Sequence, residues 1–275
     1  MIRSAREGDR DAVLALWNCC FPDESGFNDY FFSHIFDLKT VLLYELDGHI
    51  AAMTQMLPHR MSGGEVYTYI YGACTHPEYR RRHLMSELLL CSFALDRVLM
   101  RAGSILIPAE PWLFDFYAQF GYQPAFPLRT TVWEGKGKSG TLSMLSEADI
   151  PKMNALYVSM LSTYAGHLVR MDAEWRRQLR LFDALGCGCV GVWSDAHTLD
   201  GYAFLWKPED GAVYAQEVCA RDAACRERLL AAAAAQCGVS RVRVSEPAVD
   251  GPALGCMKRY DGGQPPCVYM NLMLN

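Results

Sequence analysis

Residues 71–90, YGACTHPEYRRRHLMSELLL, place three consecutive arginines between an apolar segment and a helical pattern. Positive charge at a helix N-terminus opposes the helix dipole and costs about 0.3 to 1 kcal/mol for each exposed cation. A bound anion would offset that cost, because free backbone N–H groups and guanidinium groups would both point at it. The alternative is a turn of solvated charges, in which Arg80, Arg81 and Arg82 bind nothing. The apolar strand and helix on either side favour the anion site.

Eleven cysteines form a second group of reactive side chains. Their number is odd and they are scattered, which does not fit the disulfide framework of a small secreted domain, so we expect reduced thiols. Cys19 with Cys20, and Cys187 with Cys189, raise the question of a metal site. Neither pair has a second pair at the spacing of a zinc finger, and buried cysteine packs as a small apolar residue. We expect structural roles for these thiols and no metal.

A strand, a turn and a helix position the arginines. We expect the strand over residues 67–75, and the His76-Pro77 pair ends it. The helix that follows has the apolar spacing of one buried face, from Leu84 to Leu88 and Leu89. Around these elements the first half predicts a strand at 2–5, helices at 9–21 and 30–36, a hairpin of VLLYEL and HIAAMTQML, a strand at 105–107, a helix at 112–120 and a strand at 130–133.

The most linker-like segment is EGKGKSG, residues 134–140, with three glycines and alternating charge. It predicts domains over residues 1–135 and 141–275. Beyond the linker the order of elements partly recurs, with helices at 147–162 and 172–185, strands at 190–193, 201–206 and 213–220, a helix at 221–237 and a strand at 241–244. The expected fold class is α/β, with two mixed, mostly antiparallel sheets flanked by helices, one in each half.

The composition excludes several classes of protein. The 275 residues are 51% hydrophobic and 21% charged, unlike a disordered chain. The net charge of -5 gives no general attraction for nucleic acid or an anionic membrane, so any anion site must be local. No apolar run approaches the roughly 20 residues of a membrane-spanning helix. The N-terminal MIRSAREGDRDAV lacks the apolar core of a signal peptide. We therefore expect a cytoplasmic protein that binds neither nucleic acid nor membrane.

The arginine turn resembles a known cofactor signature. Residues 75–85, THPEYRRRHLM, are similar to Val-x-Pro-x-Tyr-Arg-x-x-Gly-x-Gly/Ala, the acetyl-coenzyme A signature of the GNAT (GCN5-related N-acetyltransferase) family. Residues 117–122, YAQFGY, resemble the Tyr-x-x-x-Gly-Phe/Tyr segment that supplies the family's general acid. The run from Tyr79 to Arg82 looks most like the enhanced-intracellular-survival (Eis) branch, whose members carry a second GNAT-like domain. The resemblance therefore implies two tandem GNAT-like domains, the second of them degenerate.

The resemblance implies a role for each matching residue. Backbone groups of Ala73, Cys74 and Thr75 would pair with the pantetheine arm of acetyl-CoA and offer an N–H to the thioester carbonyl. Tyr117 would protonate the departing thiolate. The pyrophosphate would lie against the turn and the first helical residues, Arg80, Arg81, Arg82, His83, Leu84, Met85 and Ser86. The implied reaction transfers an acetyl or short acyl group from acetyl-CoA, a co-substrate, to a primary amine by direct attack.

The sequence departs from the family pattern in several places. His83 stands where the family has the Gly that lets the backbone approach the pyrophosphate, so its side chain either blocks the phosphate or binds it as an imidazolium. Met85 replaces the second small residue. Eis-branch relatives carry a third, sterol-carrier-like domain, and their C-terminal carboxylate can enter the active site. By this resemblance the Asn275 carboxylate is one candidate general base. This sequence stops at Asn275, about where the third domain would begin, which counts against that role.

Other side chains near the implied site have two interpretations. Glu110, Asp115 and His76 are further candidates for the base, or are solvated and structural. An aromatic group on the helix at 112–120 lines a substrate pocket or belongs to the core, namely Trp112, Phe114 and Phe116. In the second half, residues 218–222, VCARD, lack both the proline and the basic run. We expect no second cofactor there.

Three functions remain open from the sequence. The first is an N-acetyltransferase whose acceptor is a small-molecule or peptide amine. The second is a non-catalytic acyl-CoA-binding or protein-interaction module on the same fold, motivated by His83. The third is nucleotide or phosphoprotein binding through the arginines alone. The acceptor amine cannot be read from the sequence, because loops vary freely on a shared scaffold. The oligomeric state is also open, although the Eis branch often forms hexamers.

Overall fold

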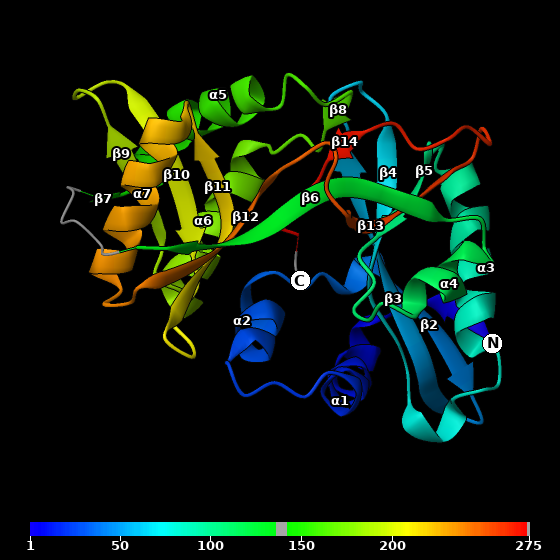
Figure 1. Ribbon diagram of the computed structural model, residues 1–275. Coiled ribbons are helices and arrows are strands. Elements are labelled where there is room, and N and C mark those ends of the chain that lie inside the picture. Colours follow the sequence, from blue (N-terminus) through cyan, green and yellow to red (C-terminus); the bar gives the residue numbers. More distant parts are fainter. Residues whose placement is uncertain (136–141, 274–275) are drawn as a thin grey trace. The chain divides into compact units, whose positions relative to one another are not determined.

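The structure, a computed structural model, describes residues 1–135 and 142–273. The chain divides into two compact units, which we call unit 1 (Met1–Ala125 with Gly255–Pro265) and unit 2 (Phe126–Leu254 with residues 266–273). Each unit contains a mixed, mostly antiparallel sheet flanked by helices (Figure 1). The predicted α/β fold class is confirmed. The domain bounds expected from the sequence, 1–135 and 141–275, remain predictions, and most of the proposed linker lies outside the described residues.

Unit 1 is built on strands in the order β1-β2-β3-β4-β5-β13. All neighbouring pairs are antiparallel except β4 and β5, which run parallel and are connected through α3. The strands are β1 (Ile2–Ser4), β2 (Val41–Leu46), β3 (His49–Arg60), β4 (Val66–Thr75), β5 (Gly103–Leu106) and β13 (Ala253–Arg259). The helices are α1 (Arg10–Cys20), α2 (Phe27–His34), α3 (Leu84–Val98) and α4 (Leu113–Ala118).

The two faces of this sheet are covered by different helices. Along β2, Val41 and Leu43 pack with α1 and α2, whereas Leu42 packs with Leu84 and Leu88 of α3. This alternation follows from the two-residue period of a strand. Figure 1 shows α1 and α3 on either side of β2 and β3. Helix α4 joins α3 in a second cluster on Ile70 of β4. The end of β4 is therefore enclosed by α1 on one face and by α3 and α4 on the other.

A β-bulge interrupts β4 in its second half. The register with β3 places Met53 opposite Cys74 and Gln55 opposite Tyr71, so that two residues of β4 face one residue of β3. One of the two is Gly72, whose φ is 57°, in the left-handed region. A Cβ at Gly72 would collide with the ring of Trp17 in α1. The bulge and the close approach of α1 therefore both require glycine here.

Two strands depart from the sequence-based expectation. The segment expected at residues 130–133 as the last strand of the first half belongs to β6 (Gln123–Glu134), which pairs with β12 (Arg241–Pro247). The sixth strand of unit 1 is instead β13, from near the C-terminus, which pairs with β5 and places Cys256 opposite Leu106. No pattern in the sequence predicts β13. Its pairing with β5 joins residues about 150 positions apart, and a local sequence pattern does not predict such a pairing.

Unit 2 has strands in the order β6-β12-β11-β10-β9-β7. Among the described strands of this sheet only β11 and β12 run parallel, and α7 connects them, as α3 connects β4 and β5. The further elements of unit 2 are β7 (Ser143–Met144), α5 (Ile150–Met160), α6 (Asp172–Leu185), β9 (Cys189–Trp193), β10 (Leu199–Leu205), β11 (Ala212–Ala220) and α7 (Ala223–Gln236). A separate parallel pair joins β8 (Gly166–His167) to β14 (Val268–Tyr269).

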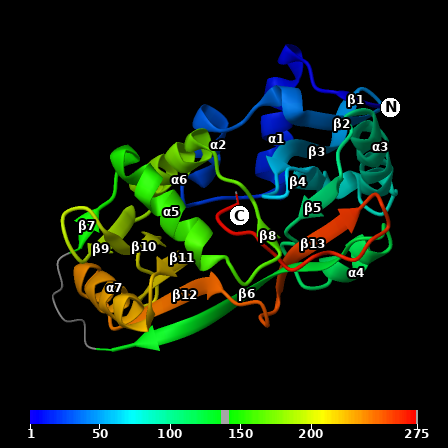
Figure 2. The ribbon, with the colours of Figure 1, turned by 90° about the horizontal axis from the view of Figure 1, so that it is seen from above.

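The sheet of unit 2 is also covered on both faces. Ala203 and Leu205 of β10 pack with α7, while the intervening Phe204 contacts the rings of Trp175 and Phe182 in α6. Figure 2 shows α5 and α6 on one side of these strands and α7 on the other. No helix in the described ranges is long and apolar enough to cross a membrane.

Candidate active site

The end of β4 has an open edge. Its pairing with β5 covers only Tyr67, Thr68 and Tyr69, and β5 itself ends at Leu106. Residues 70–75 therefore have β3 on one side, and within the described ranges no strand pairs with them on the other. The open edge offers backbone groups to an extended ligand, which could pair with it as a strand would. Ala73, Cys74 and Thr75, singled out by the sequence, lie on this segment.

The loop after β4 has a strained backbone. A short 3-10 turn (Pro77–Tyr79) begins at His76, whose Nδ1 accepts a hydrogen bond from the Glu78 N–H at 3.3 Å. Beyond it, Arg81 and His83 have φ angles of 63° and 60°. Left-handed backbone costs a residue with a side chain roughly 1 to 2 kcal/mol. His83 therefore adopts the conformation that the glycine of the resembling signature favours, although it carries an imidazole.

The N-terminus of α3 presents free donors. His83 is the N-cap residue, and its side chain makes no capping hydrogen bond. The N–H groups of Leu84, Met85 and Ser86 have no hydrogen-bond partner in the described part of the chain, because the first bond into this turn is from Glu87 to the His83 carbonyl at 3.1 Å. Such donors, together with the helix dipole, form a site suited to an anion.

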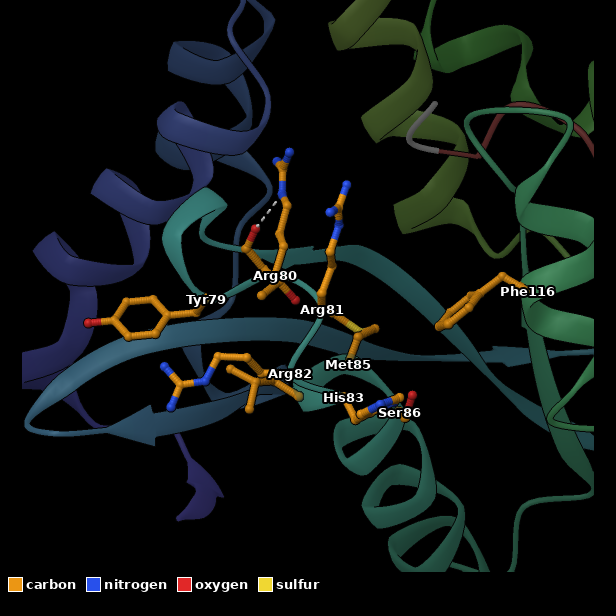
Figure 3. A pocket seen from close by; sticks show the side chains of 10 residues that line it. Tyr79, Arg80, Arg81, Arg82, His83, Met85, Ser86 and Phe116 are labelled. Atoms are coloured by element: carbon orange, nitrogen blue, oxygen red, sulfur yellow. Dashed lines mark hydrogen bonds between the residues drawn. The ribbon is translucent and has the colours of Figure 1, made fainter.

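A pocket of about 180 Å³ opens at these donors (Figure 3). The residues that line it come from the end of β4, the loop, the start of α3 and α4, and are Thr75, Tyr79, Arg80, Arg81, Arg82, His83, Leu84, Met85, Ser86 and Phe116. The structure thus brings eight of the ten sequence-predicted cofactor residues to one pocket, while Ala73 and Cys74 lie beside it on β4. The other two lining residues are Tyr79 and Phe116, and the sequence had suggested Phe116 as part of a substrate pocket.

The three arginines have different environments. Arg80 donates from Nε to the Thr75 carbonyl at 3.2 Å, so it braces the end of β4. The Arg82 guanidinium lies over the Tyr79 ring at 5.6 Å. Figure 3 shows Arg80 and Arg81 extending to one side of the loop, while Arg82 turns toward Tyr79. Among the described residues, no carboxylate forms an ion pair with any of the three. Their charge is available to a ligand.

Tyr117 lies directly behind the pocket wall. It follows Phe116 in α4, and the two rings are 5.2 Å apart. Tyr117 is only 7% exposed and packs in the cluster that also contains Met85 and Phe116 of the pocket. Burial, with a smaller contribution from Cys256, raises the pKa of Tyr117 to about 12. With this pKa the hydroxyl is protonated at neutral pH, and it has no hydrogen-bond partner in the described part of the chain.

The candidate bases do not converge on this pocket. Glu110 and Asp115 are exposed and lie outside its lining, and His76 is engaged through Nδ1 by the Glu78 N–H. Asn275 lies outside the described residues, so its carboxylate stays a prediction. Of the aromatic group on α4, Phe116 lines the pocket while Trp112 is largely exposed. In the described ranges no group of three or more His, Cys, Asp or Glu side chains is arranged to hold a metal ion.

Comparisons with known proteins agree with the sequence motifs. Residues 1–125 match the model of an acetyltransferase (GNAT) domain. A GCN5-related N-acetyltransferase from Kribbella flavida is similar in structure, with a TM-score of 0.71 and 16% identity over 95% of this chain and 71% of the other. Eis1 from Mycobacterium abscessus has a TM-score of 0.61, with 14% identity over 95% of this chain and 67% of Eis1.

A third solved structure is the N-myristoyltransferase of Saccharomyces cerevisiae with bound myristoyl-CoA, with a TM-score of 0.59 and 10% identity over 98% of this chain and 84% of that enzyme. At such low identity these likenesses establish the fold alone. No curated protein matches the sequence. The match to the domain model spans residues 1–125 and so includes every residue that lines the pocket.

Proposed function

We propose that this protein is an N-acetyltransferase that moves an acetyl or short acyl group from acetyl-CoA to a primary amine by direct attack. The observation that carries the proposal is the pocket in which uncapped N–H groups of α3, two arginines without carboxylate partners and the open edge of β4 meet. Each part has a counterpart in acyl-CoA, whose pyrophosphate needs donors and cations and whose pantetheine arm carries amides that pair with backbone. The match of residues 1–125 to a GNAT domain supports the same assignment.

In this proposal different residues bind different parts of acetyl-CoA. The N–H groups of Leu84, Met85 and Ser86 hold the pyrophosphate, and the guanidinium groups of Arg81 and Arg82 add charge-assisted hydrogen bonds. Arg80 acts on the strand rather than on the ligand, because its Nε already bonds the Thr75 carbonyl. The backbone of Ala73, Cys74 and Thr75 pairs with the pantetheine arm and leaves one N–H for the thioester carbonyl.

The chemical step needs little from the protein beyond position and one proton. A neutral amine must lie about 3 to 3.5 Å from the thioester carbon, and the oxygen that gains charge needs a donor. Tyr117 supplies the proton that the departing sulfur requires. Because its pKa is near 12, it remains protonated throughout the neutral range. The base that takes the amine proton is unassigned, and the Asn275 carboxylate stays one proposal for it.

The first experiment is isothermal titration of acetyl-CoA into the wild-type protein, with ATP as the control anion. We expect micromolar binding of acetyl-CoA and none of ATP, because ATP lacks the pantetheine arm that pairs with β4. Equal binding of both would favour a nucleotide or phosphate site instead. Release of free CoA thiol in the presence of polyamines, aminoglycosides or peptide amines then tests turnover and identifies the acceptor class.

A Tyr117→Phe variant tests the proposed acid. The substitution keeps the buried ring and removes only the hydroxyl, so we expect unchanged acetyl-CoA binding and a turnover number lower by about 10² to 10⁴. Phe116→Leu is a suitable control, since it changes the pocket wall without touching the proton donor. Full turnover in Tyr117→Phe would remove Tyr117 from the mechanism.

One feature favours a second function, a non-catalytic acyl-CoA-binding module. His83 adds an exposed side chain at the mouth of the pocket, where the resembling signature has none. If the imidazole excludes the pyrophosphate, the wild-type protein will not bind acetyl-CoA but His83→Gly will. Turnover of any amine by the wild type would exclude this alternative.

A further inference from the structure

Two thiols meet where α1 reaches the end of β4, on the sheet face opposite α3. Cys20 is the last residue of α1 and is half-buried, and Cys74 is a buried residue of β4. The Cys20 Sγ donates to the Thr75 carbonyl at 3.5 Å, and Arg80 Nε donates to the same oxygen at 3.2 Å. Cys74 belongs to the apolar cluster against which Cys20 packs, and the two thiols share a hydrogen bond.

The surroundings make the two sulfurs chemically unequal. The hydrogen bond from Cys74 and then the charge of Arg80 lower the pKa of Cys20 to about 7, against the opposing effect of burial. The same hydrogen bond and burial raise the pKa of Cys74. Cys20 is therefore the thiolate that attacks, and Cys74 is a protonated thiol beside it. The remaining ionisable group facing Cys20 is Cys19, which is exposed and adjacent in the chain.

Other cysteines lack this combination. Cys91 of α3 is also half-buried and lies in unit 1, but burial raises its pKa. Cys256, beside Tyr117, is buried with a pKa near 12. A thiol that is both accessible and ionised near neutral pH, with a second thiol in contact, is the arrangement of a redox-sensitive pair.

We propose that Cys20 and Cys74 form a peroxide-sensitive thiol pair that closes into a disulfide between α1 and β4. The Cys20 thiolate attacks one peroxide oxygen, the O–O bond breaks, Cys20 becomes a sulfenic acid, and hydroxide leaves. The proton that the Cys20 thiol had released converts this hydroxide to the first water. The Cys74 sulfur then attacks the Cys20 sulfur, the S–O bond breaks, and a second water carries away the Cys74 proton. In sum, two thiols and one hydrogen peroxide give one disulfide and two water molecules.

The disulfide would act on the pocket through Thr75. It removes the Cys20 thiol that donates to the Thr75 carbonyl and draws the preceding residue, Cys74, toward α1. Thr75 lines the pocket, and Arg80 is braced on the same carbonyl. We therefore expect oxidation to weaken acyl-CoA binding, an expectation that rests on the function proposed above. Thiol reductants would restore binding.

Peptide mapping of the full chain tests the disulfide without reference to any ligand. The reduced protein is treated with equimolar hydrogen peroxide, alkylated and digested with trypsin, which separates residues 11–39 from residues 61–80. We expect these two peptides to be cross-linked, with two hydrogens lost, and the link to disappear with dithiothreitol. Cys19→Ser is the matched control and keeps the link. In Cys74→Ser, dimedone should trap sulfenic acid at Cys20. A map in which Cys20 stays reduced, or bonds to a cysteine other than Cys74, would overturn the proposal.

Two further measurements test the thiol pair and its effect on the pocket separately from the proposed function. At pH 7 iodoacetamide should alkylate Cys20 about tenfold faster than Cys91, because about half of a thiol of pKa 7 is ionised. Titration of acetyl-CoA into the oxidised protein should show at least a tenfold weaker Kd than into the reduced protein. Equal affinities would overturn the coupling to the pocket. Absence of binding in the reduced protein would instead contradict the proposed function, while the peptide map still decides the disulfide.

Discussion

Helices α3 and α7 each connect two parallel strands of their unit, but their N-termini differ in how the free N–H groups are satisfied. In unit 1, α3 begins at His83, which caps nothing, and the preceding Arg81 and Arg82 have no carboxylate partner in the described ranges. In unit 2, α7 begins at Asp222, whose Oδ1 accepts from the Cys225 N–H at 2.8 Å. The same topological position therefore presents free donors in one unit and donors already satisfied in the other.

The arginines of the two units differ in the same sense. At the start of α7, Arg221 and Arg228 both form ion pairs with the buried Asp200. Deeper in unit 2, Arg170 bonds both oxygens of Glu217 at 2.6 Å, and Tyr202 and Tyr269 donate to the same carboxylate. Unit 2 supplies carboxylate partners for these arginines, whereas the arginines of the loop before α3 have none in the described ranges. Of these two helix N-termini, that of α3 is the one whose N–H groups and neighbouring arginines are left for a ligand.

The largest effect should come from the buried arginine of unit 2. In Arg170→Met, the Glu217 carboxylate, whose side chain is 0% exposed, would lose its cationic partner, and breaking a buried ion pair in this way costs about 3 to 5 kcal/mol of unfolding free energy. Arg81→Met, on the exposed loop of unit 1, should change stability by less than about 0.5 kcal/mol. Thermal unfolding of both variants measures the difference. The double variant Arg170→Met/Glu217→Gln should be less destabilised than Arg170→Met, and a loss under about 1 kcal/mol in Arg170→Met would contradict the comparison.

The next effect concerns ligand binding rather than stability. Removing both free guanidinium groups in Arg81→Ala/Arg82→Ala should weaken acetyl-CoA binding about 100-fold, because hydrogen bonds to charged groups contribute about 1.5 to 3 kcal/mol each before solvent screening. The fold should be unaffected. Arg228→Ala is the matched control in unit 2, and its acetyl-CoA affinity should equal that of the wild type. Equal losses in the two variants would mean that binding does not reside in unit 1 alone.

A smaller effect should distinguish the two helix N-termini directly. Asp222→Ala removes the side-chain cap of α7 and should cost about 1 kcal/mol of unfolding free energy, within a range of about 0.5 to 2 kcal/mol. Ser86→Ala on α3 is the control, because it lies at a helix N-terminus that has no side-chain cap. Urea denaturation should show little change for Ser86→Ala. A similar cost for both would show that Asp222 is not the cap.

The sequence predicted the pocket better than the elements that complete it. The strand, turn and helix around Arg80–Arg82 follow from apolar periodicity and from Pro77, which are local signals. The residues that resemble the cofactor signature are contiguous in the sequence, so the position of one fixes the positions of the others. Cys20 and β13 were missed because each reaches its place through contacts between residues far apart in sequence. The bond from Arg80 to the Thr75 carbonyl was also missed, since a side chain with several donors has no partner fixed by its sequence.

The smallest effect tests whether the His83 side chain contributes to acetyl-CoA binding or obstructs it. His83→Gly relieves the left-handed backbone but gives the unfolded chain more freedom, so the net gain should be only about 0.5 to 1 kcal/mol. Leu90→Gly, at an exposed interior position of α3, is the matched control and should lose about 1 kcal/mol. The affinity of His83→Gly for acetyl-CoA then assigns the imidazole. Tighter binding means that the side chain obstructs the phosphate, and weaker binding means that the side chain contributes to holding it.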